Sequence, residues 1–275
     1  MVRPARGVGV STAEVFEKAR AEGRAVLVGY LPAGFPTVAG GIAAIRAIVE
    51  AGVDLVEVGL PYSDPVMDGP VIQRATEVAL AGGVRTADVL RTVEAVADAG
   101  ARVLVMTYWN PIERYGVDAF ARDLAAAGGA GLITPDLIPD EAADWLAASD
   151  QHGLDRVFLV APSSTDARLA MTVAHCRGFV YAAALMGVTG ARDQLSAAAP
   201  KLVARIRAVS SIPVGVGLGV SSGGQAAAVA SYADAVIVGS ALVSRLLEAP
   251  DEQTGLAGLR ALASDLATGV RTPAG

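Results

Sequence analysis

DLVEVGLP, residues 54–61, is one of eight short apolar runs that organise this chain. The other seven runs are AVLVGYLP (25–32), RVLVMTYW (102–109), GLITPD (131–136), RVFLVAP (156–162), FVYAAAL (179–185), PVGVGLG (213–219) and AVIVGS (235–240). Their apolar residues are continuous rather than alternating, which is typical of strands that are covered on both faces of a parallel sheet. The runs therefore predict eight buried, parallel strands.

Longer, alanine-rich segments of helical period separate these runs. In residues 37–52, Ile42, Ile45 and Ile48 form one apolar stripe, and Gly52 marks a helix stop. Similar patterns occur in residues 140–153, 201–210, 221–233 and 255–270. Another such segment, residues 12–23, precedes the first run.

Eight strands alternating with helices are typical of a (β/α)8 TIM barrel, and the length of 275 residues suits that fold. We therefore predict a single barrel domain over residues 1–275, with an extra N-terminal helix. A doubly wound open sheet is the alternative.

Composition narrows the class of protein. The chain is 53% hydrophobic and 18% charged, so it can bury a large core. A net charge of -6 without clusters of Lys and Arg argues against a nucleic-acid partner. The apolar stretches are too short to span a membrane, and the first residues lack the apolar region of a signal peptide. These features predict a cytoplasmic globular protein with neither a nucleic-acid nor a membrane partner.

Glu57 is the unusual residue of the run at 54–61. In a strand, Leu55, Glu57 and Gly59 share one face and Val56 and Val58 the other. If the valines face the helices, Glu57 points into the barrel near the C-terminal strand ends, where barrel enzymes place their active sites. A core glutamate with a local partner is the alternative, but lone buried carboxylates are rare. Burial would raise the pKa of Glu57 and make it an acid/base near neutral pH.

Other polar residues follow the predicted strands. Asp64 fits a turn former as well as a functional residue, whereas Asp68 has the stronger claim because it shares a rim with Glu57. Asn110 begins an Asn-Pro turn or contributes to the site, and Asp136 makes an Asx turn or binds a substrate. We interpret Tyr108 and Trp109 as packing residues.

One loop and two strand ends complete the predicted rim. Residues 186–200 form a long loop of small residues, which is a lid candidate. Glycines at the ends of the seventh and eighth runs let backbone N–H groups approach an anion, and Ser221 or Ser222, and Ser240, are candidate helix caps. A phosphate site after strands seven and eight recurs in this fold.

The shortage of other reactive residues limits the chemistry. The two lysines, Lys18 and Lys201, and the two histidines, His152 and His175, lie in or at the ends of helical segments rather than at strand ends. That placement argues against a Schiff-base aldolase and against a histidine-rich metal site. The single cysteine, Cys176, excludes a thiolate cluster. We therefore expect acid/base chemistry by carboxylates, without a metal, on a phosphorylated small molecule.

Residues 57–75, EVGLPYSDPVMDGPVIQRA, resemble the signature E-[LV]-G-x-P-[FY]-S-D-P-x-x-D-G-P-x-I-Q of the tryptophan synthase α subunit family. TYWNPI, GLITPDLIPDE, GVTGAR, VGLGVSS and VIVGSALV match further family stretches in the same order. The resemblance implies a (β/α)8 barrel lyase that cleaves indole-3-glycerol phosphate to indole and glyceraldehyde 3-phosphate. It also implies an allosteric α2β2 complex that passes indole to a β subunit. Pyridoxal phosphate belongs to that partner, so no cofactor is expected in this chain.

The same resemblance assigns roles to residues. It implies that Glu57 is the general acid/base, that Asp68 interacts with the indole N–H, and that Thr189 takes part in loop closure. The implied substrate- and phosphate-binding residues are Tyr30, Tyr181, Gly190, Gly219, Gly239 and Ser240. The implied contacts with the partner are Pro61, Asp64 and Asn110.

Two other functions stay open at this point. The chain could be a free-standing phosphate-binding barrel enzyme that releases indole without a partner. It could also be a non-catalytic protein that only activates a β subunit, although the intact pair of carboxylates argues against that function.

Overall fold

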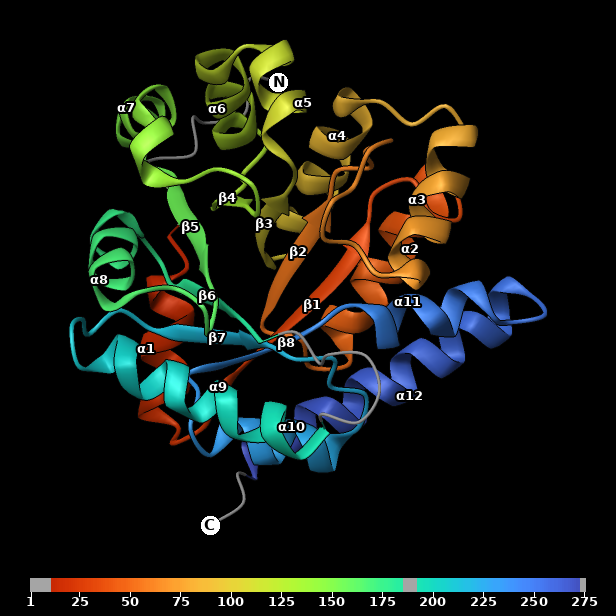
Figure 1. Ribbon diagram of the computed structural model, residues 1–275. Coiled ribbons are helices and arrows are strands. Elements are labelled where there is room, and N and C mark those ends of the chain that lie inside the picture. Colours follow the sequence, from red (N-terminus) through yellow and green to blue (C-terminus); the bar gives the residue numbers. More distant parts are fainter. Residues whose placement is uncertain (1–10, 185–191, 273–275) are drawn as a thin grey trace.

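The computed structural model of the protein describes residues 11–184 and 192–272, and for residues 192–197 it describes only the backbone. Eight parallel strands form a closed barrel in chain order, and β1 pairs with β8 (Figure 1). The strands are β1 Val26–Pro32, β2 Leu55–Gly59, β3 Arg102–Met106, β4 Gly131–Thr134, β5 Asp155–Val160, β6 Val180–Ala183, β7 Val214–Gly217 and β8 Ala235–Val238. Closure confirms the predicted barrel and excludes the open sheet.

Each predicted run contains one strand, and most strands end before the run does. In the run at 54–61, the pairing of β2 with β3 ends at Gly59, opposite Met106. The last residues of the run therefore begin the loop that leads into Asp64 and Asp68. This early ending places the polar residues that follow the strands at the rim of the barrel.

Helices surround the barrel, and every segment that the sequence predicts to be helical contains one (Figure 1). They are α1 Ala13–Ala21, α2 Val38–Glu50, α3 Pro70–Ala81, α4 Thr86–Ala97, α5 Trp109–Tyr115, α6 Val117–Ala126, the 3-10 helix η1 Pro139–Glu141, α7 Ala143–His152, α8 Asp166–His175, α9 Arg192–Arg207, α10 Gly223–Ala230, α11 Ser240–Leu247 and α12 Glu252–Arg271.

The prediction of a loop over residues 186–200 is wrong in its second half. Helix α9 begins at Arg192, and Pro200 lies inside this helix. The sequence interpretation took Pro200 as the end of the loop, but the three alanines before it have the highest helix propensity and continue the helix through it. The predicted loop is therefore shorter, and its first residues, up to 191, lie outside the described part of the chain.

The core has two layers, which confirms the predicted faces of β2. Val56 and Val58 belong to the layer between the strands and the helices. Leu55 belongs to a second cluster inside the barrel, together with Leu104 and Ile237. Glu57 lies on the same face as Leu55, so its side chain is directed into the barrel.

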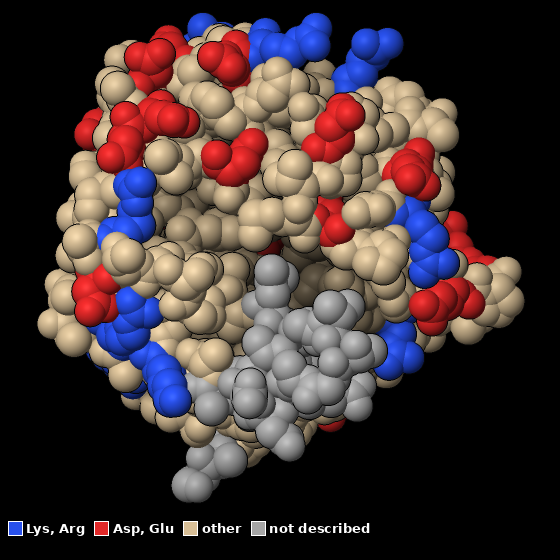
Figure 2. Space-filling model, in the orientation of Figure 1, with Lys and Arg blue, Asp and Glu red and all other residues tan. Residues whose placement is uncertain are grey.

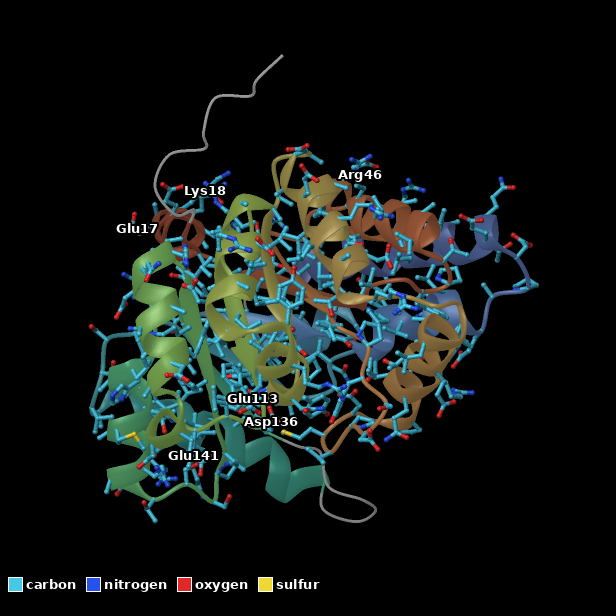
Figure 3. The ribbon with its side chains drawn as sticks, turned by 90° about the horizontal axis from the view of Figure 1, so that it is seen from above. Glu17, Lys18, Arg46, Glu113, Asp136 and Glu141 are labelled. Carbon is cyan, nitrogen blue, oxygen red and sulfur yellow. The ribbon has the colours of Figure 1, made fainter. Side chains whose placement is uncertain are left out.

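Helix α1 closes the N-terminal end of the barrel. Phe16 and Ala19 of this helix belong to the cluster inside the barrel, and the ring of Phe16 lies 5.5 Å from that of Phe179. Figure 3 shows Glu17 and Lys18 of α1 at one end of the molecule, with Asp136 at the opposite end, where the strands finish. The open end of the barrel is therefore the one that carries the predicted site.

A buried carboxylate holds the start of α1 against the barrel. Asp155, the first residue of β5, has 0% of its surface exposed. Its Oδ2 accepts hydrogen bonds from the Thr12 N–H (2.7 Å) and the Thr12 hydroxyl (2.8 Å), and the Ser11 hydroxyl donates to Oδ1 (3.1 Å). These bonds tie two residues at the start of the described chain to β5, so they fix α1 across the end of the barrel.

We predict that Asp155→Ala lowers the free energy of unfolding by about 2 to 4 kcal/mol, because it leaves the buried N–H and hydroxyl of Thr12 unpaired. Urea unfolding followed by far-UV circular dichroism measures the change. Asp140→Ala is the matched control, since Asp140 pairs with Arg168 on the surface, and it should change stability by less than about 1 kcal/mol. Equal effects of the two substitutions would contradict the role of Asp155.

Candidate active site

A cavity of about 360 Å³ opens at the C-terminal ends of the strands. Figure 2 shows this face with a hollow near its middle and most of the charged side chains around its edge. The cavity brings together many of the predicted site residues: Tyr30, Glu57, Asp68, Tyr181, Gly219, Gly239 and Ser240. Its other lining residues are mainly apolar, among them Met106, Leu159 and Ile237. The site therefore combines a few polar groups with an apolar wall, as small-molecule sites commonly do.

Glu57 is the most unusual group in this cavity. It is 1% exposed, and neither carboxyl oxygen has a hydrogen-bond partner among the described residues. Burial disfavours the charged form and raises the pKa of Glu57 from its ordinary value of 4.5 to about 8. At neutral pH the side chain is therefore largely protonated, and it can donate a proton to a ligand in the cavity.

Two buried tyrosines line the cavity near Glu57. Tyr30 lies beside Glu57 in the register of β1 and β2, and Tyr181 comes from β6. Gly59 and Gly217 make room for them, because a Cβ at either glycine would overlap the hydroxyl of Tyr30 or Tyr181, respectively. Burial raises the pKa of both phenols well above the ordinary value, so both stay uncharged. The two rings therefore act as neutral walls of the cavity.

Asp68 is the second carboxylate of the site, and its environment differs from that of Glu57. It lies half-buried in the loop between β2 and α3, where its Oδ1 accepts a hydrogen bond from the Tyr108 hydroxyl (3.1 Å). Burial raises the pKa of Asp68, and the hydrogen bond from Tyr108 opposes that rise. Two carboxyl groups in unequal environments can divide the acid and base roles of a reaction.

The far end of the cavity is formed by the loops after β7 and β8. Gly219 has a φ of 75°, and Gly239 and Ser240 begin α11, which has no side-chain cap. The first N–H groups of a helix have no acceptor within the helix, and the helix dipole favours an anion there. The start of α11 is therefore suited to a phosphate group.

Helix α10 is less suited to that role, although the sequence points to both helices. The Ser222 hydroxyl accepts from the Gln225 N–H, and the Gly223 N–H donates to the carboxylate of Asp265 (2.6 Å). The Ser221 N–H donates to the Gln225 side chain (2.8 Å). These donors already have protein partners, so the anion end of the cavity centres on Gly219, Gly239 and Ser240.

The residues predicted to meet a partner lie outside the cavity. Asp64 and Asn110 are exposed, whereas Pro61 is buried within this chain. The Asn110 side-chain amide donates to the Tyr62 hydroxyl (3.0 Å). Thr189 and Gly190 lie outside the described residues.

Asp136 has a structural role. Its carboxylate accepts from the Trp109 N–H (2.9 Å) at the first residue of α5, so it satisfies a free donor of that helix. This contact favours the structural role of Asp136 over the alternative that it binds a substrate.

Sequence reasoning missed Tyr108. The sequence predicts a packing residue at this position, and the ring of Tyr108 is indeed buried, but its hydroxyl binds the loop that carries Asp68. The one signal in the sequence is position, because Tyr108 follows β3, the neighbour of the strand that bears Glu57.

The remaining candidate groups do not form a metal site. Within residues 11–184 and 192–272, no group of three or more His, Cys, Asp or Glu side chains could hold a metal ion. His152 contacts Asp118 and His175 contacts the Met171 carbonyl. Burial raises the pKa of the Cys176 thiol to about 12, so this thiol is unreactive at neutral pH.

None of the described helices is long and apolar enough to cross a membrane.

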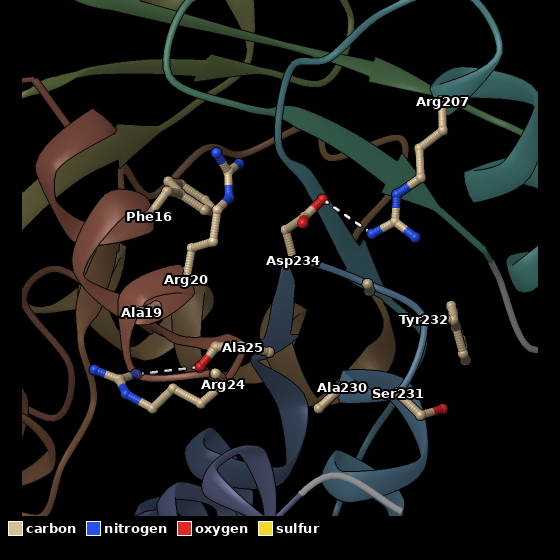
Figure 4. Close-up of a pocket in the computed structure, with 12 residues that line it drawn as sticks. Phe16, Ala19, Arg20, Arg24, Ala25, Arg207, Ala230, Ser231, Tyr232 and Asp234 are labelled. Carbon is tan, nitrogen blue, oxygen red and sulfur yellow. Dashed lines mark hydrogen bonds and ion pairs between the residues drawn. The ribbon is translucent and has the colours of Figure 1, made fainter. Parts of the chain in front are cut away.

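A second cavity, of about 240 Å³, lies at the other end of the barrel beside α1 (Figure 4). Arg207 and Asp234 form an ion pair across it (3.3 Å), and Asp234 also accepts from the Val214 N–H (2.9 Å). Arg24, another lining residue, pairs with Asp54 (2.8 Å) and Glu22. The charges around this cavity are therefore largely balanced by neighbours within the chain.

Comparison with known proteins gives a consistent result. The family model "Tryptophan synthase alpha chain" matches residues 16–271. The tryptophan synthase alpha chain of Salinispora arenicola is 74% identical over 259 residues, which cover 94% of this chain and 97% of that one. The alpha chain of Mycobacterium tuberculosis H37Ra is 67% identical over 257 residues, 94% of this chain and 93% of that one.

Solved structures agree. A structure of Mycobacterium tuberculosis tryptophan synthase has a TM-score of 0.89 and 65% identity, and the match covers 96% of this chain and 99% of that chain. Tryptophan synthase subunit alpha of Legionella pneumophila has a TM-score of 0.85 at 34% identity, over 94% of this chain and 97% of that chain. The fold, the extent of the match and the identity lead to one conclusion: this chain belongs to the tryptophan synthase alpha chain family.

Proposed function

We propose that Glu57 and Asp68 carry the acid/base chemistry by which this chain acts as a lyase. As a member of its family, the chain cleaves indole-3-glycerol phosphate to indole and glyceraldehyde 3-phosphate. The observation that carries the proposal is the buried, unpaired carboxyl group of Glu57, which shares one cavity with Asp68. A buried carboxyl without a protein partner is destabilising, so its presence in a cavity indicates a functional group.

We assign the two roles from the unequal environments of the two carboxyl groups. Glu57 donates its proton to the indole carbon that bears the glycerol chain, which leaves a positive charge on the ring. The Asp68 carboxylate accepts a hydrogen bond from the indole N–H and stabilises that positive charge. The bond between this carbon and the glycerol chain then breaks, and its electrons return to the ring. The hydroxyl proton of the chain passes to the Glu57 carboxylate as the aldehyde forms.

This mechanism requires no electron sink other than the indole ring. It therefore agrees with the positions of Lys18 and Lys201, which lie in α1 and α9 rather than at strand ends. We propose accordingly that no cofactor acts in this chain. We also propose that residues 1–275 form a single domain, which the closed barrel supports, and that this domain is cytoplasmic.

The rest of the cavity positions the substrate in this proposal. Tyr30 and Tyr181, with Met106 and Leu159, form the neutral and apolar wall that suits an indole ring. Gly219, Gly239 and Ser240 bind the phosphate group through backbone N–H groups. Thr189 and Gly190 stay predictions from the sequence for loop closure and phosphate binding.

The partner in this proposal is a tryptophan synthase β subunit in an α2β2 complex, which receives indole and holds the pyridoxal phosphate. Asp64 and Asn110 are exposed beside the mouth of the site, and Val66 of the same loop is 76% exposed. We propose that these side chains contact the β subunit and that Pro61, which is buried, shapes the loop from within. Contact at this loop would couple the partner to Asp68.

We predict that Glu57→Gln and Asp68→Asn each lower the rate of indole release by about two to four decades, the usual contribution of an acid or base group. The assay measures indole formed from indole-3-glycerol phosphate by the full chain alone. Asp64→Asn is the matched control, because it makes the same change in the same loop outside the cavity, and its rate should stay within about twofold of wild type. Near-normal turnover of Glu57→Gln would show that the acid/base assignment is wrong.

The raised pKa of Glu57 predicts a pH-dependent stability. Because this pKa is about 8 in the folded chain, the folded state keeps a proton that the unfolded chain releases above about pH 4.5. The contribution of this group to stability is therefore lost as pH rises towards 8. Relative to Glu57→Gln, the wild type should lose about 1 to 4 kcal/mol between about pH 5 and pH 8, as measured by urea unfolding. Parallel pH curves for the two proteins would contradict the burial argument.

The partner surface can be tested with Asp64→Asn in the presence of the β subunit. We predict that β-dependent activation of indole release falls about threefold to tenfold, because an exposed charge at an interface rim contributes modestly to association. Glu17→Gln is the control, since Glu17 lies at the opposite end of the barrel (Figure 3). An equal response to β from the two variants would remove Asp64 from the interface.

A further inference from the structure

The hydroxyl of Tyr108 binds two consecutive residues of the loop that carries Asp68. Its oxygen accepts a hydrogen bond from the Met67 N–H (2.9 Å) and donates to Oδ1 of Asp68 (3.1 Å). One phenol therefore holds both the backbone and the acidic side chain of this loop. Both distances lie within the range of good hydrogen bonds.

Among the described residues, Tyr108 is the one side chain that hydrogen-bonds the Asp68 carboxylate. The other described bond at this residue goes to its backbone, where the Gln73 side chain donates to the Asp68 carbonyl (2.8 Å). Oδ1 is thus anchored by Tyr108, and no described residue binds Oδ2, so within the described chain Oδ2 is available to a ligand in the cavity. This division leaves one carboxylate oxygen free to accept an N–H group.

The loop has little other support near Asp68. Val66 and Met67 are exposed, although both are apolar, so packing contributes little to the position of this segment. A loop of this kind needs polar anchors to keep a side chain in one orientation. The Tyr108 hydroxyl supplies such an anchor, because it binds both the Met67 N–H and the Asp68 carboxylate.

Tyr108 is itself held in place. Its side chain is mostly buried, with the residue 5% exposed, and its ring contacts that of Tyr62 in a tilted arrangement with centroids 5.4 Å apart. The Tyr62 hydroxyl accepts from the Asn110 amide (3.0 Å). The residue after Tyr108 is fixed by the hydrogen bond from the Trp109 N–H to Asp136 (2.9 Å). A support with its own rotamer and backbone fixed can orient the group that it contacts.

We propose that Tyr108 is a positioning residue of the lyase reaction, which holds Asp68 with one carboxylate oxygen directed at the substrate. The proposal rests on the role of Asp68 given above. Tyr108 does not touch the reacting atoms in this account, and it acts through Asp68.

The charges around Asp68 support a second effect of the same bond. Among the described residues, the titratable groups that line the same cavity as Asp68 are Glu57, Tyr30 and Tyr181, and Tyr108 binds its carboxylate. The pKa of Tyr108 is raised to about 12, so its proton stays on the phenol. Donation by Tyr108 lowers the pKa of Asp68 against the effect of burial. Removal of the hydroxyl should therefore raise the pKa of Asp68 further and move the deprotonation of this carboxyl to higher pH.

The experiment compares Tyr108→Phe with wild type as full chains, both alone and with the β subunit. We expect kcat/KM for indole release to fall about 10- to 100-fold, because the loss of a hydrogen bond to a charged group changes a rate by about that factor. The acidic limb of the profile of kcat/KM against pH should move to higher pH. Tyr115→Phe is the matched control. It removes the same hydroxyl from Tyr115, the last residue of α5, where that group makes a hydrogen bond to Asp123 on the surface, and the kinetics of this variant should match wild type.

A double substitution separates positioning from general support of the fold. In an Asp68→Asn background, Tyr108→Phe should cost less than about twofold, because residues that act as one unit are not additive. If Tyr108→Phe has wild-type kinetics and pH profile, or if its full loss persists in the Asp68→Asn background, the inference is overturned. A near-normal rate for Asp68→Asn would instead overturn the proposed function itself.

Discussion

The buried carboxyl group of Glu57 is the constraint on which the rest of the site depends. A carboxyl without a hydrogen-bond partner among the described residues is destabilising, and it persists only where the surrounding structure offsets it. Here the closed barrel does so, because β2 is paired on both sides and its other side chains are fully buried. The pKa shift that suits Glu57 to proton transfer is thus a direct result of the packing around it.

The two ends of the barrel divide stability and chemistry. At the N-terminal end, α1 covers the interior and the Asp155 carboxylate is fully used by hydrogen bonds to Ser11 and Thr12. At the C-terminal end, the Glu57 carboxyl lines a cavity and has no hydrogen-bond partner among the described residues. The same functional group, a buried carboxyl, therefore serves opposite purposes: that of Asp155 is bound by Ser11 and Thr12, and that of Glu57 has no hydrogen-bond partner within the described chain.

The second carboxylate depends on a different kind of support. Glu57 is fixed by the strand that carries it, whereas Asp68 lies in a loop whose neighbouring side chains are exposed. The hydroxyl of Tyr108, a residue that follows β3, binds this carboxylate and so supports its orientation. The exposed Asn110 binds the Tyr62 hydroxyl, and the Tyr62 ring contacts that of Tyr108, which binds Asp68. This series of contacts places the proposed partner surface next to the proposed catalytic group.

The sequence by itself determined the barrel, the faces of β2 and the rim on which Glu57 and Asp68 lie, because strand period and buried apolar runs are local properties of the chain. It predicted the wrong end for the loop after β6, where alanines continue α9 through Pro200. Only the tertiary structure decided that α11 rather than α10 has free N–H groups, that Asp136 caps α5, and that Tyr108 holds Asp68. Each of these depends on hydrogen bonds between residues far apart in sequence, and a hydrogen bond is set by distance and direction, which no local pattern encodes.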